Sequence, residues 1–143
     1  MTWADRLRRL VKIANRLETL EVRYLGVSGV SLLRRRAVLV LETTGRRTGR
    51  RRRVVLSYLE RDGAFVVGGG AGGMTKVDWV ANLRTNPDAT VWVRRTPIDV
   101  HARELRDDER VAAHDRAMAR WPEVSRYEEV SGRLVPYFAF TRR

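Results

Sequence analysis

The sequence predicts a single α+β domain that is mostly β: an antiparallel barrel with an amphipathic helix at its amino end and further helices outside. Three observations predict this class. A chain of 143 residues is long enough to bury one core but not two. The predicted elements run helix, three strands, helix, two strands, helix and strand, without the βαβ alternation of a parallel sheet. The consecutive strands are joined by short turn signals, as in hairpins. We therefore expect about six mainly antiparallel strands.

The amino-terminal segment, residues 1–30, is predicted to be a helix followed by a loop. Its apolar residues recur at helical spacing along one stripe, at Trp3, Leu7, Leu10, Ala14, Leu17 and Leu20. Two interpretations are open. The favoured one is that the stripe packs on the helix's own domain, and the other is that residues 3–20 contact a membrane surface or a partner.

The barrel core is predicted over residues 37–140. Runs rich in β-branched and aromatic residues predict strands at 37–44, 52–60, 64–68, 89–93, 98–104 and 133–140. Helices are expected over 77–85, which Asn86-Pro87 ends, and from Asp107, a favourable N-cap, to Trp121. One or two further helical turns are expected over 123–130. With no linker between these elements, residues 1–143 form one domain.

Composition excludes several classes of protein. There is no cysteine, so disulfides, thiol chemistry and thiolate zinc sites are excluded. No apolar run approaches about 18 residues, and the amino end lacks the continuous apolar region of a secretory signal. A cytoplasmic location is therefore expected.

The charge of the chain is concentrated in one turn. The formal net charge is +12, and residues 34–53 hold nine arginines against a single acid, Glu42. Six of these arginines lie in GRRTGRRRR, residues 45–53, between two predicted strands. Guanidinium groups bind phosphates and carboxylates through two parallel hydrogen bonds, so this turn is expected either to bind an anion or to be a solvated charged face.

Few residues suit direct catalysis by the protein. The two histidines, His101 and His114, lack metal-ligand spacing, so no metal site is expected; a structural role is favoured for the first and a solvated position for the second. No G-x-S-x-G nucleophile motif occurs. The run GGGAGG, residues 68–73, contains a G-x-G-x-x-G match without the acidic residue of a Rossmann site, and it indicates either close approach of main chain to a ligand or a flexible loop.

Three blocks in order resemble the deazaflavin-dependent nitroreductase family. They are TTGRRTG at 43–49, the glycine-rich segment followed by W-x-x-N-L-x-x-N-P at 79–87, and an aromatic segment around Trp121, Pro122 and Tyr127. The resemblance covers about residues 37–140. It implies a split β-barrel related to FMN-binding barrels and the cofactor coenzyme F420, with FMN less favoured. The deazaflavin of F420 carries a phosphodiester and an oligoglutamate tail, which would match the arginine turn.

The resemblance also implies roles for individual residues. Arg46, Arg47 and Arg52 match positions that hold the phosphate, and Arg50, Arg51 and Arg53 are expected to reach tail carboxylates. Backbone groups of residues 54–58 would meet the deazaflavin ring edge. The full set of implied cofactor-binding residues is Arg46, Arg47, Thr48, Gly49, Arg52, Val55, Leu56, Ser57, Gly68, Gly69, Gly70, Ala71, Trp79 and Asn82.

The implied reaction is hydride transfer from C5 of reduced F420 to a quinone, a nitroaromatic compound or an activated C=C bond. Trp121, Val124 and Tyr127 would line a pocket for a hydrophobic substrate, and Tyr127 is the candidate proton donor. A homodimer is plausible by analogy with split barrels. Two alternatives stay open: a basic nucleic-acid-binding module, for which no aromatic pair or recognition helix is evident, and a flavin- or deazaflavin-binding barrel without turnover.

Overall fold

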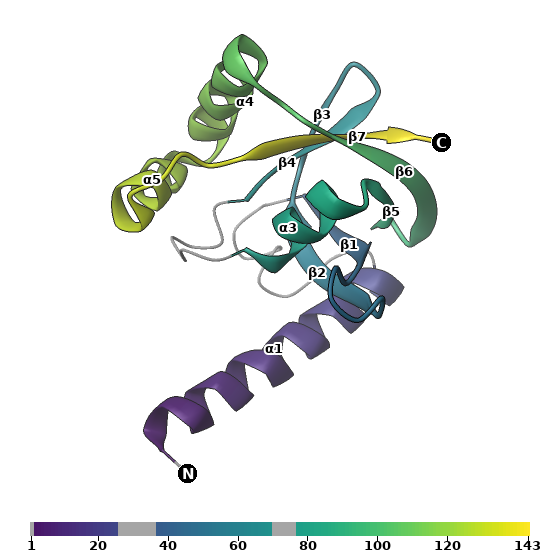
Figure 1. Ribbon diagram of the computed structural model, residues 1–143, viewed down its shortest axis with the longest axis vertical. Helices are drawn as coiled ribbons and strands as arrows, with labels where there is room; N and C mark the ends of the chain where they lie inside the picture. Colours follow the sequence, from purple (N-terminus) through teal and green to yellow (C-terminus); the bar gives the residue numbers. More distant parts are fainter. Residues whose placement is uncertain (1, 26–36, 70–76) are drawn as a thin grey trace.

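The computed structural model describes residues 2–25, 37–69 and 77–143 (Figure 1). In these ranges a strongly curled antiparallel sheet forms the body of the molecule, and helices lie against its two faces. The elements, in chain order, are α1 (Trp3–Leu25), β1 (Val38–Thr44), β2 (Arg51–Ser57), β3 (Leu59–Arg61), β4 (Ala64–Gly68), α3 (Asp78–Thr85), β5 (Asp88–Val93), β6 (Thr96–Glu104), α4 (Asp107–Arg120), a 3₁₀ turn (Pro122–Val124), α5 (Ser125–Ser131) and β7 (Tyr137–Arg142).

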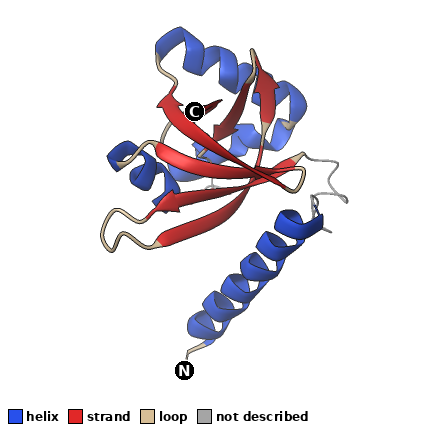
Figure 2. Cartoon of the chain, turned by 90° about the vertical axis from the view of Figure 1, so that its right-hand side faces the viewer, coloured by secondary structure: helices blue, strands red, loops and turns tan. Residues whose placement is uncertain are grey.

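The sheet has seven strands in the order β2-β1-β5-β6-β7-β4-β3, and every pair is antiparallel. The run at 52–60, expected as one strand, is divided at Tyr58. Ser57 pairs with Val38 of β1, whereas Leu59 pairs with Val66 of β4. The chain thus passes directly from one edge of the sheet to the other, which brings the two edges together as in the predicted split barrel (Figure 2).

The core lies on the concave side of the sheet. Alternate strand residues point inward, among them Leu39 and Leu41 of β1 and Phe138 and Phe140 of β7, and all four are almost fully buried. Helix α3 adds its own apolar side chains to this cluster. The ring of Trp79 meets that of Phe138 edge to face at 5.7 Å, so α3 is held firmly against the inner face.

Helix α4 packs on the outer face of β4 and β7. Ala113 and Ala117 of the helix form a second apolar cluster with outward-facing strand residues such as Val66 and Ala139. The helix begins at Asp107, and the preceding residue is Arg106, without a side-chain capping hydrogen bond. The expectation that Asp107 would cap the helix is therefore wrong; instead, three acids in its first turn face the positive end of the helix dipole.

Helix α1 projects from the body of the molecule (Figure 1). Part of it lies against β1 and β2. The expectation that its apolar stripe would pack on its own domain is wrong for most of the stripe. Its large side chains are exposed, namely Trp3 (78%), Leu7 (48%), Leu10 (63%), Leu17 (58%) and Leu20 (49%). No helix in the described ranges has the length and apolar character needed to cross a bilayer.

Candidate cofactor-binding site

The arginine turn between β1 and β2 is closed by its own backbone. Gly45 donates to the carbonyl of Arg50 at 2.7 Å, and Gly49 donates to the carbonyl of Gly45 at 2.9 Å. Gly49 has φ of +70°, in the left-handed region that favours glycine. Thr48 accepts a hydrogen bond from the Arg50 amide through its Oγ1 at 3.3 Å. The turn therefore has a defined shape from which its arginine side chains project.

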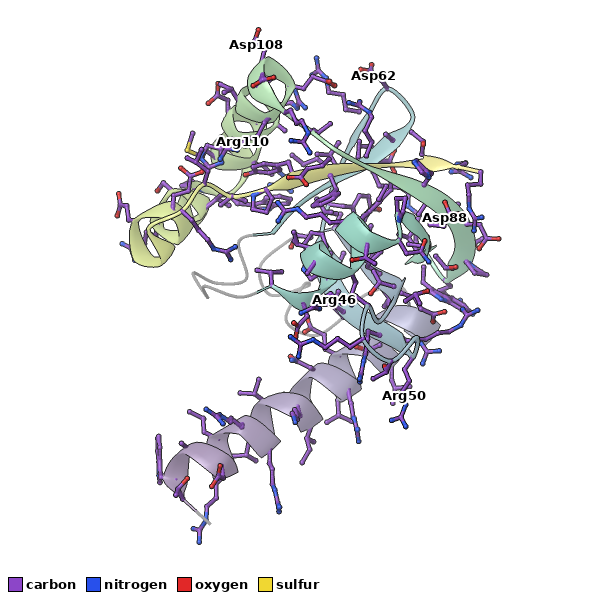
Figure 3. The ribbon with its side chains drawn as sticks, in the orientation of Figure 1. Arg46, Arg50, Asp62, Asp88, Asp108 and Arg110 are labelled. Carbon is purple, nitrogen blue, oxygen red and sulfur yellow. The ribbon has the colours of Figure 1, made fainter. Side chains whose placement is uncertain are left out.

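Arg46 clamps this turn to α3. Its backbone amide and its Nη1 both donate to Oδ1 of Asn82, at 3.1 and 3.0 Å, and its Nη2 pairs with Asp78 at 3.2 Å. The Asn82 side chain, 2% exposed, in turn donates to Oγ1 of Thr43 at 3.2 Å. Figure 3 shows Arg46 beneath α3. Arg46 and Asn82 were expected to contact the cofactor. In the structure they bind each other, and this contact positions the turn against α3.

Arg51 and Arg53 point to the other face of the sheet. Side chains alternate along β2, and these two both bind the carboxylate of Glu42 on the outer face of β1, Arg53 at 2.6 Å. Glu42 is 6% exposed. Burial would raise its pKa, but hydrogen bonds from Arg53 and Arg51 hold the pKa below its usual range. These two arginines, expected to reach a cofactor tail, already have a carboxylate partner.

Arg47, Arg50 and Arg52 are the cations that the turn leaves available. All three are exposed, and within the described ranges none has an acceptor for its guanidinium group. Arg50 extends away from the body in Figure 3. Arg52 alternates with Arg51 and Arg53, so it projects from the same face of β2 as Val54 and Leu56, toward the α3 side. Three unpaired guanidinium groups beside a Gly-bounded turn suit a phosphate or carboxylate ligand.

Strand β2 offers a second means of binding. It is at the end of the strand order and pairs with β1 along one side only, so its outer edge has no strand partner in the described part of the chain. Val55, Leu56 and Ser57 are half-buried on this edge strand. Backbone groups along this outer edge can hydrogen-bond to the polar rim of a flat ligand, and the sequence predicts this contact for all three residues.

The start of the glycine segment is close-packed against the protein itself. A Cβ on Gly68 would lie 2.8 Å from the ring of Tyr137, and one on Gly69 would lie 2.8 Å from Val80 and 2.9 Å from Pro136. These two positions require glycine without any ligand present. Gly70 and Ala71 fall outside the described residues. Trp79 is 7% exposed and belongs to the core, so it supports α3 rather than forming a surface of the site.

Behind Gly68 lies a buried polar network that the sequence did not reveal. The hydroxyl of Tyr137 and Nδ1 of His114 are 2.8 Å apart, and Nε2 of His114 is 3.7 Å from Glu128. Glu128 accepts hydrogen bonds from Arg110 at 2.5 Å and from the Val135 amide at 3.0 Å. The expectation of a solvated His114 is wrong: it is 9% exposed. His101 lies on β6 and pairs with Asp88 on the surface.

The predicted substrate residues lie on a different part of the molecule from the turn. Trp121 follows α4 and packs with the outer-face cluster, and Val124 is buried. Tyr127 is on α5, but its side chain lies outside the described residues. In Figure 1, α5 and the turn after β1 are on opposite sides of α3. The structure does not bring Trp121 and Val124 into contact with the arginine turn.

The family model described as F420H(2)-dependent quinone reductase matches residues 14–141. Among solved structures, an F420-H2 dependent reductase (FDR-A) is 30% identical with a TM-score of 0.64, covering 72% of this chain and 92% of its own. A structure described as a domain-swapped dimer is 27% identical with a TM-score of 0.68, covering 97% and 99% of the two chains. The haem storage protein HutZ from Vibrio cholerae, 15% identical over 80% of this chain and 87% of its own with a TM-score of 0.55, shares the fold.

Proposed function

The chain belongs to the F420H(2)-dependent quinone reductase family and is an oxidoreductase with coenzyme F420 as its cofactor, and we propose that it reduces a hydrophobic quinone. The observation that carries the proposal is the β1–β2 turn, which Arg46 and Asn82 fix to α3 and whose Arg47, Arg50 and Arg52 have no acceptor among the described residues. The alternative hydride acceptors are nitroaromatic compounds and activated C=C bonds. A cytoplasmic location belongs to the same proposal.

In this proposal Arg47 and Arg52 hold the cofactor phosphate and Arg50 meets a tail carboxylate. The edge of β2 orients the deazaflavin ring, which when bound supplies the hydride. The protein contributes charges that bind the cofactor and an orientation that brings the deazaflavin ring to the substrate. Holding two reactants in the right geometry by itself lowers the barrier to hydride transfer. Because α5 lies across α3 from the turn, we place the substrate on the α5 side of the deazaflavin ring, with Tyr127 as the candidate proton donor and with Trp121 and Val124 next to α5.

The binding test is a fluorescence titration of the full-length protein with F420 at physiological salt. We expect saturable binding that FMN does not displace. The double variant Arg47→Gln/Arg52→Gln should weaken binding by roughly a hundredfold or more, because it removes two charged hydrogen bonds that contribute about 1.5–3 kcal/mol each when well formed. Arg94→Gln/Arg95→Gln is the matched control: it also removes two charges, from the exposed β5–β6 turn, at the far end of the strands.

Turnover with reduced F420 then separates the remaining alternatives. Oxidation of the cofactor by a naphthoquinone, faster than by a nitroaromatic compound, would support the quinone proposal. Binding without turnover would favour a non-catalytic barrel. Displacement of F420 by FMN and by a DNA oligonucleotide to the same extent would mean that the turn is a general polyanion surface, and the assignment of the turn would fall.

We also propose that a second copy of the chain covers the apolar stripe of α1. The similar structure described as a domain-swapped dimer matches 97% of this chain, which supports a dimer, and we choose α1 as the exchanged element because its stripe is exposed. An exposed apolar stripe of this length marks an interaction surface. The basic residues beside the stripe, Arg6, Arg9 and Lys12 among them, would also suit an anionic membrane surface, and this is the competing interpretation.

A further inference from the structure

A groove on the outer face of the sheet lies far from the arginine turn. Its volume is about 370 Å³, and it runs between the β3–β4 hairpin, strands β6 and β7, and helix α4. Figure 3 places Asp62, at the rim of the groove, at the top of the view, whereas Arg46 and Arg50 lie near its middle, next to α1. The groove is therefore separate from the proposed cofactor site.

The floor of the groove is apolar and made of small side chains. Ala64 and Val66 of β4 and Ala139 of β7 face outward there, next to Leu105. All four are at most 8% exposed. Because Ala64 and Ala139 are small, the groove is deeper there than it would be with larger side chains. A hydrocarbon or aromatic group placed on this floor would gain the free energy of apolar burial.

Among the described residues, the rim carries one cation without a partner. Arg103 is neutralised by Glu109 through two hydrogen bonds of 2.9 and 3.0 Å, and Arg61 lies 3.7 Å from Asp62. Arg116 of α4 is half-buried, and in the described ranges its guanidinium group has no acceptor. A partly desolvated guanidinium beside an apolar floor gains most from a carboxylate that reaches it across that floor.

We propose that this groove binds a small amphipathic monoanion, with its carboxylate on Arg116 and its hydrocarbon or aromatic body on the alanine floor. The volume is at the lower end of the range for small-molecule sites, about 300–1,000 Å³. A single unpaired cation favours one negative charge, unlike the three free arginines of the cofactor turn. The proposal is independent of the cofactor and of the proposed reaction.

The test is a titration of the full-length protein with octanoate, followed by amide shifts in nitrogen-15 NMR spectra. We expect saturable shifts at groove residues such as Ala64, Ala112 and Ala139. Octanamide, with the same body but no charge, and acetate, with the charge but no body, should bind at least tenfold more weakly. Arg116→Gln should weaken octanoate binding about tenfold, as expected for one charged hydrogen bond.

Filling the groove provides a second, independent variant. Ala112 lines the groove from the exposed surface of α4, so Ala112→Phe should block it without disturbing the core. Ala119→Phe, also exposed on α4 but outside the groove, and Arg95→Gln are the matched controls and should bind octanoate normally. The proposal is overturned if octanoate shifts residues of α1 instead, if octanamide binds equally well, or if Ala112→Phe leaves the affinity unchanged. Shifts at the groove that follow protein concentration rather than octanoate would reveal contact between copies and also overturn it.

Discussion

Glu42 explains how a strand with three consecutive arginines can pair in a sheet. Like charges on one face of a strand repel, but Arg51 and Arg53 share the Glu42 carboxylate on the outer face, while Arg52 projects from the opposite face. One acid therefore pairs with Arg51 and Arg53, whereas Arg52 has no acidic partner among the described residues. The sequence shows that Glu42 is the only acid among the nine arginines but not which of them it binds.

The Glu42 carboxylate should stabilise the fold at neutral pH and lose this effect in acid. Its pKa is lower in the folded protein than in the unfolded chain, so its contribution is full above about pH 4.3 and falls as the pH drops through the folded pKa. Glu42→Gln should lower the free energy of unfolding by about 1 kcal/mol at pH 7. Urea unfolding of both proteins between pH 3 and pH 7 measures the difference.

The difference between wild type and Glu42→Gln should shrink toward zero at the acid end of this range. Glu60→Gln, at an exposed residue of β3, is the matched control, and its effect should be small at every pH. A difference that stays constant across the range would mean that the Arg51–Glu42–Arg53 contacts contribute through shape and not through charge.

At the scale of elements, the sequence predicted those strands that the local pattern of β-branched residues determines. The strands at 37–44, 64–68 and 89–93 follow from their β-branched runs, and the structure forms each within about one residue of the expected ends. The division of 52–60 was not predictable, because Leu59 changes partner only when the curled sheet brings β4 beside it. The burial of His114 likewise depends on Tyr137, a residue 23 positions away in the chain.

For the candidate site too, the sequence predicted the local pattern but not the contacts between distant segments. The TTGRRTG block, residues 43–49, placed the arginine turn between two strands, as observed. The sequence could not separate its arginines into those that bind the protein and those that are free. That division depends on the face of β2 from which each projects and on Asn82, which reaches the turn from α3.

Gly69, the residue after β4, contacts both α3 and the residue before β7. Gly69 donates to the carbonyl of Pro136 at 2.8 Å, so the end of β4 is tied to the residue before β7. A Cβ at this position would contact both Val80 of α3, at 2.8 Å, and the Pro136 ring, at 2.9 Å. Gly69 is therefore positioned by packing against α3 and against the residue before β7.

Gly69→Ala should destabilise the protein by about 1–3 kcal/mol, the range for overpacking a filled site, because the proline ring cannot move aside. Val80→Ala alone should also destabilise it by creating a cavity in the core. In the double variant the new methyl group occupies part of that cavity. The double variant should therefore lose less free energy of unfolding than the two single variants lose together. Thermal and urea unfolding of the four proteins gives this coupling. A fully additive result would show that Val80 is not the obstacle.

At the scale of the whole molecule, charge and apolar surface are segregated. Within the described residues, the unpaired arginines Arg47, Arg50 and Arg52 lie at the β1–β2 turn, and the groove with its one unpaired arginine, Arg116, lies beside the β3–β4 hairpin. Helix α1 projects from the body with an apolar stripe (Figures 1 and 3). A helix of 23 residues is about 35 Å long, comparable to the diameter of a small domain. Such a stripe stays in water only at a large cost in solvation, so it should be covered in the assembled protein.

The double variant Leu10→Gln/Leu17→Gln should convert a dimer into a monomer. Both side chains are more than half exposed within one chain, so their loss should leave the melting temperature of the barrel within about 2–4 °C. Sedimentation velocity measures the assembly. Leu134→Gln, at a leucine that is 67% exposed outside α1, is the matched control and should remain dimeric. A wild-type protein that is monomeric contradicts the exchange of α1; if that monomer also co-sediments with anionic vesicles and the double variant does not, the stripe is a membrane contact instead.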